Sequence, residues 1–420
     1  SKRVISWILN ADMILNNSEK SFRKKFFESL IIQINHLKKN IHYENNPIKK
    51  IEILSAIILS GLVFKEYETN FKIGTKELKR LVEDFYDNDG FPLSRNIYDL
   101  VQSSKFLILI KECCKDAQEY IPDYLDDIVQ KIIICLNSVK TPDDNNPLFN
   151  GASEFKIKDF YEYLAGLDYR PSEIKKLIGQ IYVLNNKKVS LFFDVGPPPK
   201  KKYSRNYQCG TFSFEYYSNE NKIITNCGYG NRISKKIEQI SRLTSAQSCL
   251  TLNDTSIIKF EKNKLLNNVF GQSVKNSFKV YDLNFEENKN FFSVSAKHNA
   301  YENNFGYVHK RLIKLEKKEG NLIGEDSLIL TKPLKMENNY NIRFHLYPGI
   351  SAVQTIGGKT ILIQIKKNKS LMFTTNGDNL SVEKSVFLGK NKITNNFCIN
   401  IFGTLRNTSQ KIAWELKKNN

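Results

Sequence analysis

The sequence predicts a two-domain protein in which an α-helical domain is followed by a large antiparallel β-sandwich. The chain has 420 residues, which is more than one ordinary hydrophobic core covers. Apolar residues recur at helical spacing up to about residue 178 and in short β-rich runs after it. With 41% hydrophobic and 25% charged residues, the composition is typical of a globular chain. We therefore expect an α-helical domain at 1–178 and a β-sandwich domain at 179–420.

In the first part, helical segments alternate with short polar loops. In the first long segment, Phe26, Leu30 and Ile34 recur every four residues, and Ser18 precedes them as a candidate N-cap. The expected helices cover 18–41, 48–64, 74–87, 97–120 and 124–139. Because the connections are short, we expect antiparallel helical hairpins that stack side by side.

In the second part, short β-rich runs are separated by Asn, Gly and Lys. The expected strands cover 188–195, 211–217, 222–226, 248–252, 256–260, 291–297, 306–315, 340–347, 359–365, 396–402 and 411–416. This spacing predicts a large antiparallel sandwich. The prolines at 197–199 must end a strand, since proline cannot donate a hydrogen bond to a ladder.

The formal net charge of +19 has two interpretations. It favours a polyanionic partner, either nucleic acid or acidic polysaccharide, or it reflects lysines tolerated at surface positions of a chain rich in Lys, Asn and Ile. No nucleic-acid-binding motif accompanies the charge, so we do not expect a specific nucleic-acid partner. No apolar run reaches about 18 residues, so we expect no transmembrane helix. The sequence does not indicate an oligomeric state.

The cysteine pattern predicts neither a disulfide framework nor a zinc ribbon. The count of seven is odd, and no pair has the C-x-x-C spacing. We expect most of these cysteines to be small buried hydrophobic residues.

The segment 206–230 looks like an active-site hairpin that lacks the usual reagents. Two strand-like stretches flank a polar turn, and the second stretch runs into Asn226-Cys227-Gly228. The segment contains no histidine and no aspartate, and its strand-like stretches carry a single carboxylate, Glu215. Amides and cysteines therefore stand where catalytic hairpins usually carry imidazoles and acids.

A series of motifs links this hairpin to a known family. D-V-G-P-P-P at 194–199 is followed by T-F-S-F-E at 211–215, N-C-G at 226–228 and S-C-L-T-L at 248–252. This run resembles the heparinase II/III-like family of polysaccharide lyases, in particular a bacterial, alphaproteobacterial-like branch. The resemblance continues through 298–315 and 342–349, and it has matching landmarks at 4–15, 89–96 and 147–155 of the helical part.

The resemblance implies a fold, a chemistry and a location. The family fold is an incomplete (α/α) toroid followed by an antiparallel β-sandwich, which agrees with the independent prediction. The family chemistry is β-elimination on uronic-acid polysaccharides: a base removes the C5 proton, and an acid protonates the leaving glycosidic oxygen. The implied partner is an acidic polysaccharide or oligosaccharide in the cell envelope or periplasm. The residues show no export signal, so a cytoplasmic location stays open.

The family's metal site is altered in this chain. The resemblance places the family's His-x-His pair at Asn206 and Gln208, its zinc-binding acid at Asn226 and its second zinc-binding histidine at Gln247. Zinc binds imidazole, thiolate and carboxylate groups, whereas neutral amides are weak donors. We therefore predict that no zinc and no other cofactor binds at Gln208, Asn226 and Gln247. These amides could instead hydrogen-bond among themselves.

The neighbouring cysteines leave an alternative open. Cys209 and Cys227 each follow one of the amides, and neighbours on a strand point to opposite faces. We expect both to face away from the amide cluster, while Cys249 shares the face of Gln247. A displaced thiolate metal site is the alternative to simple packing.

The resemblance also names candidate catalytic residues. Tyr98 lies near the place of the family's tyrosine, which follows a D-G-x-x-x-[ES]-R motif. His298 and Tyr301 match a family His-x-x-Tyr stretch. The alternative for each of the three is packing in a helix or in the core.

Further residues are candidates for substrate binding. A guanidinium pairs bidentately with a uronate carboxylate, so Arg95 is expected to contact substrate. Asn206, Glu215 and His345 complete this group, although Glu215 could brace the site instead.

Other histidines have weaker support. His309 matches a further family histidine, with core packing as its alternative. His36 and His42 lie near the family's Asn-His pair, where this chain has Asn45 and Asn46.

Two functions remain open from the sequence. The first is a metal-free polysaccharide lyase, and the second is a non-catalytic glycan-binding or cell-envelope protein on the same scaffold. Loss of one acid–base group typically costs about 10²–10⁴ in rate, so the amides at Asn206 and Gln208 weaken the first.

Overall fold

The computed structural model describes residues 1–186, 188–263, 265, 267, 271–333, 337–366 and 369–418. The chain forms two compact units. Unit 1 comprises Ser1–Leu93, Tyr98–Leu136 and Pro171–Glu173 and is helical. Unit 2 comprises Ser94–Ile97, Asn137–Arg170 and Ile174–Asn420 and carries the described strands. The predicted fold class is confirmed, while a domain boundary at residue 178 stays a prediction.

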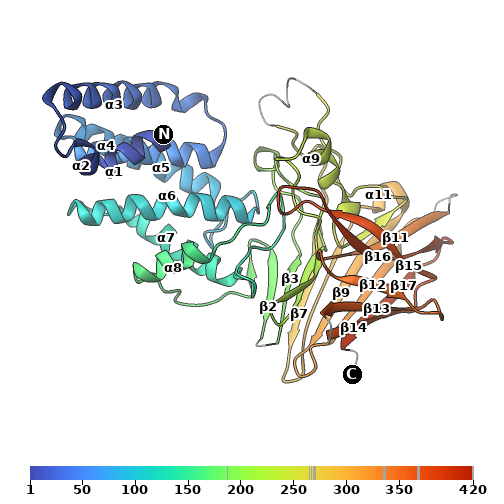
Figure 1. Cartoon of the computed structure of the whole chain (residues 1–420). Helices are drawn as coiled ribbons and strands as arrows, with labels where there is room; N and C mark the ends of the chain where they lie inside the picture. The colour runs from blue at the N-terminus through green and yellow to red at the C-terminus, as the bar shows by residue number, and fades with distance from the viewer. Residues whose placement is uncertain are drawn as a thin grey trace. The chain divides into compact units, whose positions relative to one another are not determined.

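The helices of unit 1 follow one another as antiparallel hairpins (Figure 1). They are α1 (Lys2–Leu9), α2 (Ala11–Leu15), α3 (Lys20–Asn40), α4 (Pro47–Val63), α5 (Glu68–Phe85), α6 (Ile97–Asp116) and α7 (Asp123–Ser138). Helix α4 contacts α1, α3 and α5, and its residues from Leu54 to Ser60 are buried. A helix that is apolar on most of its faces must be surrounded, which explains its central place.

Two helix starts show how side chains set the boundaries. Asn46 caps α4, because its Oδ1 accepts hydrogen bonds from the amides of Ile48 at 2.9 Å and Lys49 at 3.3 Å. The expected cap of α3 is wrong: Glu19 occupies that position, and the Ser18 hydroxyl donates to the Leu15 carbonyl instead. Ser18 thus closes the turn after α2 rather than opening α3.

Unit 2 contains two antiparallel sheets in the described chain. The order in the first sheet is β1-β2-β3-β4-β5-β11-β16-β15, and β6 also pairs with β11. Its strands are β1 (Leu177–Ile178), β2 (Ile181–Asn185), β3 (Val189–Asp194), β4 (Phe214–Ser218), β5 (Asn221–Thr225), β6 (Leu250–Leu252), β11 (Asn338–Leu346), β15 (Asn379–Phe387) and β16 (Thr394–Leu405).

The order in the second sheet is β12-β13-β14-β17-β10-β9-β8-β7. Its strands are β7 (Val280–Glu287), β8 (Phe291–His298), β9 (Tyr307–Glu316), β10 (Leu322–Leu330), β12 (Ser351–Gln354), β13 (Thr360–Lys366), β14 (Lys369–Thr375) and β17 (Gln410–Lys418). The short helices of unit 2 are α8 (Lys158–Gly166), α9 (Lys235–Ser241) and α11 (Glu302–Phe305).

Aromatic side chains join the two sheets. The rings of Phe214 on β4 and Trp414 on β17 stack with their centroids 5.6 Å apart, and Phe344 on β11 packs edge-on against Trp414 at 4.8 Å. These residues belong to one continuous buried cluster. The sandwich core is therefore built from inward-facing positions of both sheets.

One expected strand, 256–260, is a loop. The chain turns after β6 with Asn253 and Asp254 in the left-handed region, at φ of 46° and 50°. Within this range Ile257 and Ile258 are buried, and Phe260 makes an isolated bridge to Val274. Burial of these side chains explains the apolar pattern without a ladder. Strands β1, β2, β7, β10, β12, β14 and β15 were not among those expected from the sequence.

Across the described residues, no helix is both long and apolar enough to cross a membrane.

Candidate functional site

The hairpin of strands β4 and β5 lies in the middle of the first sheet. Asn219, in the turn, adopts a left-handed φ of 53°. After β5 the chain leaves the ladder through Asn226, Cys227 and Gly228. Gly228 has a φ of 81°, and a Cβ there would lie 2.6 Å from the backbone of Gly389, so only glycine fits. The N-C-G motif thus marks a close approach of two backbone segments.

Two of the altered metal-site positions meet at one backbone carbonyl. Gln208 Nε2 donates to the carbonyl of Ser241 at 2.7 Å and to that of Gly228 at 3.1 Å. Gln208 Oε1 accepts from the amide of Gly151 at 2.9 Å. Gln247 Nε2 also donates to the Ser241 carbonyl, at 2.9 Å. Each amide therefore satisfies loop backbone that the sheets leave unpaired.

The third position behaves in the same way. Asn226 Nδ2 donates to the carbonyl of Leu148 at 3.1 Å, and its Oδ1 accepts from the amide of Ser248 at 3.0 Å. The suggested hydrogen bonds among the three amides are therefore wrong, because loop backbone groups take their donors and acceptors instead. Neutral amides engaged in this way do not fit a zinc ion. No group of three or more His, Cys, Asp or Glu in the described chain could hold a metal.

The neighbouring cysteines are buried thiols. Burial raises the pKa of Cys209, Cys227 and Cys249 to about 12 in each case. Such thiols are protonated at neutral pH when no metal is bound, and these cysteines belong to no group of three or more His, Cys, Asp or Glu in the described chain that could hold one. Cys209 belongs to the sandwich core, and Cys227 Sγ lies 3.5 Å from His345 Nδ1. The displaced thiolate site is therefore not supported.

Arg95 is an internal anchor. It has a φ of 58°, and its guanidinium forms an ion pair with Asp194 and donates to the Pro197 carbonyl at 2.8 Å. A Cβ on Gly196 would lie 2.3 Å from Arg95 Cζ, so glycine makes room for the guanidinium. The predicted contact of Arg95 with substrate does not fit this geometry, because its guanidinium already binds Asp194 and the loop that follows β3.

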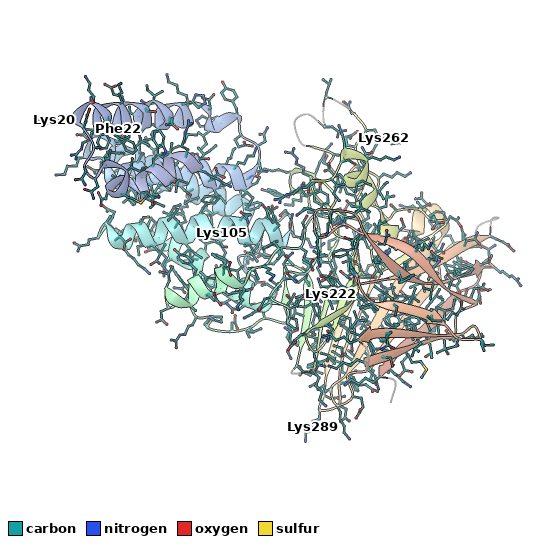
Figure 2. The ribbon with its side chains drawn as sticks, in the orientation of Figure 1. Lys20, Phe22, Lys105, Lys222, Lys262 and Lys289 are labelled. Atoms are coloured by element: carbon teal, nitrogen blue, oxygen red, sulfur yellow. The ribbon has the colours of Figure 1, made fainter. Side chains whose placement is uncertain are left out.

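Glu215 is also internal. Its side chain is fully buried, with a carboxylate oxygen 3.1 Å from Lys222 Nζ, and it accepts from Thr225 Oγ1 at 2.9 Å. Figure 2 shows Lys222 among the strands of the sandwich. Glu215 therefore braces the hairpin, and the prediction that it binds substrate is corrected.

His298 lies in a buried polar chain of the sandwich core. His298 Nε2 lies 3.0 Å from His309 Nδ1, and His309 Nε2 lies 2.7 Å from Asp326 Oδ1. Arg311 holds the same carboxylate through its Nε at 2.7 Å and its Nη2 at 2.9 Å. Burial lowers the pKa of His298 well below its usual value. These contacts join β8, β9 and β10.

Tyr301 and His345 are equally enclosed. The Tyr301 hydroxyl donates to the Leu250 carbonyl at 2.9 Å. His345 lies 3.0 Å from the Ser245 carbonyl through Nε2 and 3.0 Å from Ser385 Oγ through Nδ1. The fractional exposure is 1% for His298 and Tyr301 and 4% for His345. The catalytic and substrate-binding roles predicted for these three do not fit their burial, and the core alternative does.

Asn206 is the hairpin candidate that keeps a partly exposed side chain. The hydroxyl of Tyr229 lies 3.4 Å from Asn206 Oδ1 and donates to Glu238 Oε1 at 2.6 Å. Sequence reasoning missed Tyr229 and Glu238, although Tyr229 directly follows the N-C-G motif. These three side chains form the polar face of the site in unit 2.

The remaining candidates belong to the helical unit. Tyr98 is half-buried in the first turn of α6, and its catalytic role stays a prediction. His36 and His42 are exposed, and His36 Nδ1 lies 3.3 Å from Asn40 Nδ2. Asn46, beside the family's Asn-His position, is the α4 cap described above.

This combination of a helical-hairpin unit and a two-sheet sandwich defines the polysaccharide-lyase type of fold. The structure superposes on heparan sulfate lyase HepC from Pedobacter heparinus with a TM-score of 0.75 and 14% identity, covering 100% of this chain and 67% of that one. A heparinase III structure gives a TM-score of 0.78 with 14% identity, covering 100% of this chain and 68% of that one. At this identity the comparison establishes the fold alone.

The model of the heparinase II/III-like C-terminal domain matches residues 176–415. The chain therefore belongs to the heparinase II/III-like family. No curated protein sequence matches it.

Proposed function

We propose that this heparinase II/III-like protein recognises an acidic, uronate-containing polysaccharide or oligosaccharide. Membership of the family and the fold shared with a heparan sulfate lyase support this substrate class. The net charge of +19 supplies long-range attraction for such a polyanion. By analogy with the family, we place the protein at the cell envelope or in the periplasm.

Binding without cleavage is the function that the geometry supports best. The observation that carries it is the engagement of Gln208, Asn226 and Gln247 by loop backbone. The hairpin contains no imidazole, and the carboxylate of Glu215 is buried in an ion pair. Its partly exposed amide, Asn206, can donate to and accept from sugar hydroxyls, but the hairpin presents no group poised to move a proton.

β-Elimination is the second candidate, favoured by family membership and by the half-buried Tyr98. In this reaction a base would take the proton from C5 of the uronate, and an acid would protonate the departing glycosidic oxygen. Tyr98 is the remaining candidate for the proton transfers. No metal is assigned a step.

One experiment separates these functions. The full chain is incubated with a panel of uronate-containing polysaccharides while absorbance is followed near ~232 nm, where unsaturated uronates absorb, and binding is measured on the same samples. Binding with a flat trace supports the first candidate. A growing band that Tyr98→Phe abolishes, while Tyr43→Phe at an exposed position leaves it intact, supports the second. The absence of both binding and an absorbance change would contradict the proposal.

A further inference from the structure

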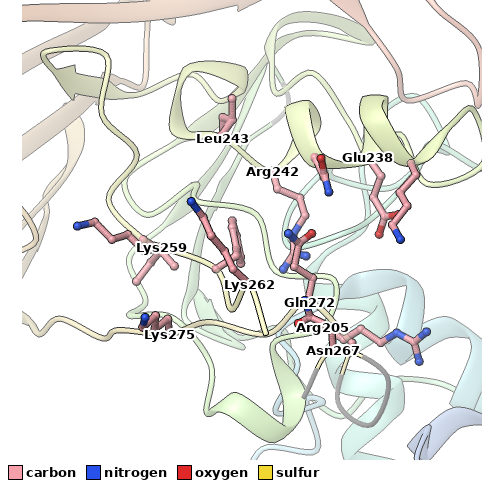
Figure 3. Close-up of a pocket in the computed structure, with 14 residues that line it drawn as sticks. Arg205, Glu238, Arg242, Leu243, Lys259, Lys262, Asn267, Gln272 and Lys275 are labelled. Atoms are coloured by element: carbon pink, nitrogen blue, oxygen red, sulfur yellow. The ribbon is translucent and has the colours of Figure 1, made fainter. Parts of the chain in front are cut away.

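Next to the hairpin, unit 2 contains a pocket of about 960 Å³ with a strongly basic wall. The described lining includes the acidic residue Glu238 and six basic residues: Arg205, Lys235, Arg242, Lys259, Lys262 and Lys275. In the view of Figure 3, Lys259, Lys262 and Lys275 lie on one side of Arg242 and Glu238 on the other. Six basic groups against one carboxylate give the described lining a net positive charge.

Arg242 is the fixed element of this wall. Only 1% of the residue is exposed, and its guanidinium carbon lies 3.8 Å from the centroid of the Phe260 ring. Nε donates to the Tyr207 carbonyl at 2.8 Å and Nη2 to the Ser204 carbonyl at 3.2 Å. The guanidinium therefore has one orientation, held by two hydrogen bonds and a ring.

The third nitrogen of this guanidinium is unused. Nη1 of Arg242 is buried and has no hydrogen-bond partner in the described chain. A buried N–H without a partner costs about 1–3 kcal/mol, more for a charged group, so native structures rarely leave one. Because Arg242 lines the pocket, an acceptor bound there would complete its set of hydrogen bonds.

The chemistry of that acceptor follows from the wall. A guanidinium matches the oxygens of sulfate, phosphate and carboxylate groups. Several exposed lysines around it favour a ligand with more than one negative charge. The volume lies in the range of small-molecule sites, about 300–1,000 Å³, and exceeds the need of a single ion.

We propose that this pocket binds a multiply charged oxyanionic ligand, with one sulfate- or phosphate-type group on Arg242 and the remaining charge on the surrounding lysines. The group can be the sulfo group of a small sulfated sugar or the phosphate of a polyphosphate. The site requires neither cleavage nor a uronate, so it goes beyond the function proposed above.

The test is calorimetric titration of the full chain with inorganic tripolyphosphate, a sulfated disaccharide and the same disaccharide without sulfate. We expect saturable binding of at least one charged probe and none of the uncharged one. The stronger of the two charged probes identifies the source of the oxyanion. Failure of both charged probes to bind at about 50 mM salt would overturn the proposal.

Two variants of equal charge show where the probe binds. Lys259→Gln with Lys275→Gln removes two lysines from the pocket wall, and Lys289→Gln with Lys359→Gln removes two exposed lysines elsewhere in unit 2. We expect the first pair to weaken binding about tenfold and the second to change it less than about twofold. Equal weakening by both pairs would mean attraction by net charge and would overturn the site.

Arg242→Lys tests the fork itself. The variant keeps the positive charge but loses the planar donors of the guanidinium. We expect its affinity for the charged probe to fall at least about tenfold relative to the parent chain. Because Arg242 also holds loop carbonyls, the paired lysine variants decide the outcome if this variant unfolds. The proposed function is tested with uronate-containing polysaccharides and this site with probes that contain no uronate, so the two proposals can fail independently.

Discussion

Single amide side chains at the altered metal-site positions connect loops that leave the sheet. Gln208 bonds the backbone of Gly151, Gly228 and Ser241, and Gln247 shares the Ser241 carbonyl. An amide can do this because its side chain carries both donors and an acceptor. The amides at these positions therefore supply hydrogen bonds to buried backbone groups.

A first prediction concerns zinc. We expect the purified protein to contain no stoichiometric zinc and its melting temperature to be unaffected by a chelator, since Gln208, Asn226 and Gln247 offer no charged donor. Metal content is measured by mass spectrometry together with thermal melting. The matched variant Gln208→His/Asn226→Asp/Gln247→His should bind zinc more tightly than the parent. Zinc retained by the parent chain through dialysis would refute the interpretation.

A second prediction concerns the buried imidazole of His345. Burial lowers its pKa to about 4 in the folded chain, against about 6.5 for an exposed histidine. Between these values the unfolded chain binds a proton that the folded chain does not. Folding stability should therefore fall as the pH drops through this window, by up to about 3 kcal/mol from this group.

The measurement for His345 is urea unfolding at several pH values. His298 and His309 also have lowered pKa values and act in the same direction, so the parent alone does not isolate one residue. His345→Gln removes a single titrating group and should reduce the loss of stability between about pH 6.5 and pH 4. Identical pH profiles for parent and variant would show that His345 does not contribute.

At the scale of elements, helix α4 owes its start to one side chain. Asn46 accepts from two backbone amides of the first turn, and Pro47 occupies the first helical position. We expect Asn46→Ala to cost about 0.5–2 kcal/mol of unfolding free energy and Asn46→Asp to cost little. Denaturant unfolding followed by circular dichroism measures both. Asn45→Ala, at the exposed preceding position, is the control, and an equal effect there would argue against capping.

Strands β10 and β17 meet where a glycine faces a tryptophan. A Cβ on Gly324 would lie 2.0 Å from Cζ2 of Trp414, inside the aromatic core. We expect Gly324→Ala to destabilise the protein by about 1–3 kcal/mol, because the ring must move. Gly357→Ala is the matched control, since a Cβ there meets nothing within 4 Å. Chemical denaturation of both variants decides the point, and equal stabilities would show that the core tolerates the added carbon.

At the scale of the whole molecule, the question is whether the +19 charge acts as a field or through a site. A field attracts every polyanion, and its effect decays with salt, whereas a built site also uses fixed hydrogen bonds. We expect affinity for duplex DNA to fall by orders of magnitude between about 50 and about 200 mM salt, and affinity for an acidic polysaccharide to fall less. Titrations with both ligands over this range make the comparison. Parallel losses would indicate charge alone.

Much of the architecture was predictable from the sequence. The helical spacing of Phe26, Leu30 and Ile34 predicts α3, and the β-rich runs of the second half predict β3, β4, β5, β6, β8, β9, β11, β13, β16 and β17. Local patterns suffice because an element must bury one face whatever its neighbours are. The loop at 256–260 was mistaken for a strand because Ile257 and Ile258 are buried in either arrangement.

The candidate site was less predictable. Arg95, Glu215, His298, Tyr301 and His345 are chemically able to bind or to catalyse, and the sequence does not show whether each meets solvent or a buried partner. In the structure all five are internal. The pairs that enclose them, such as Arg95 with Asp194, are 99 residues apart in the chain.

The sequence by itself determined the fold class, the family and the presence of neutral amides at Asn206, Gln208, Asn226 and Gln247. These properties depend on local periodicity and on residue identity. Only the tertiary structure decided that the amides bond to backbone groups, that the candidate histidines of the sandwich lie in its core and that Arg242 lines a pocket with one donor unpaired among the described residues. These properties depend on which residues, distant in the sequence, are in contact in the folded chain. Such contacts set the burial and hydrogen bonding of each group, and therefore its pKa.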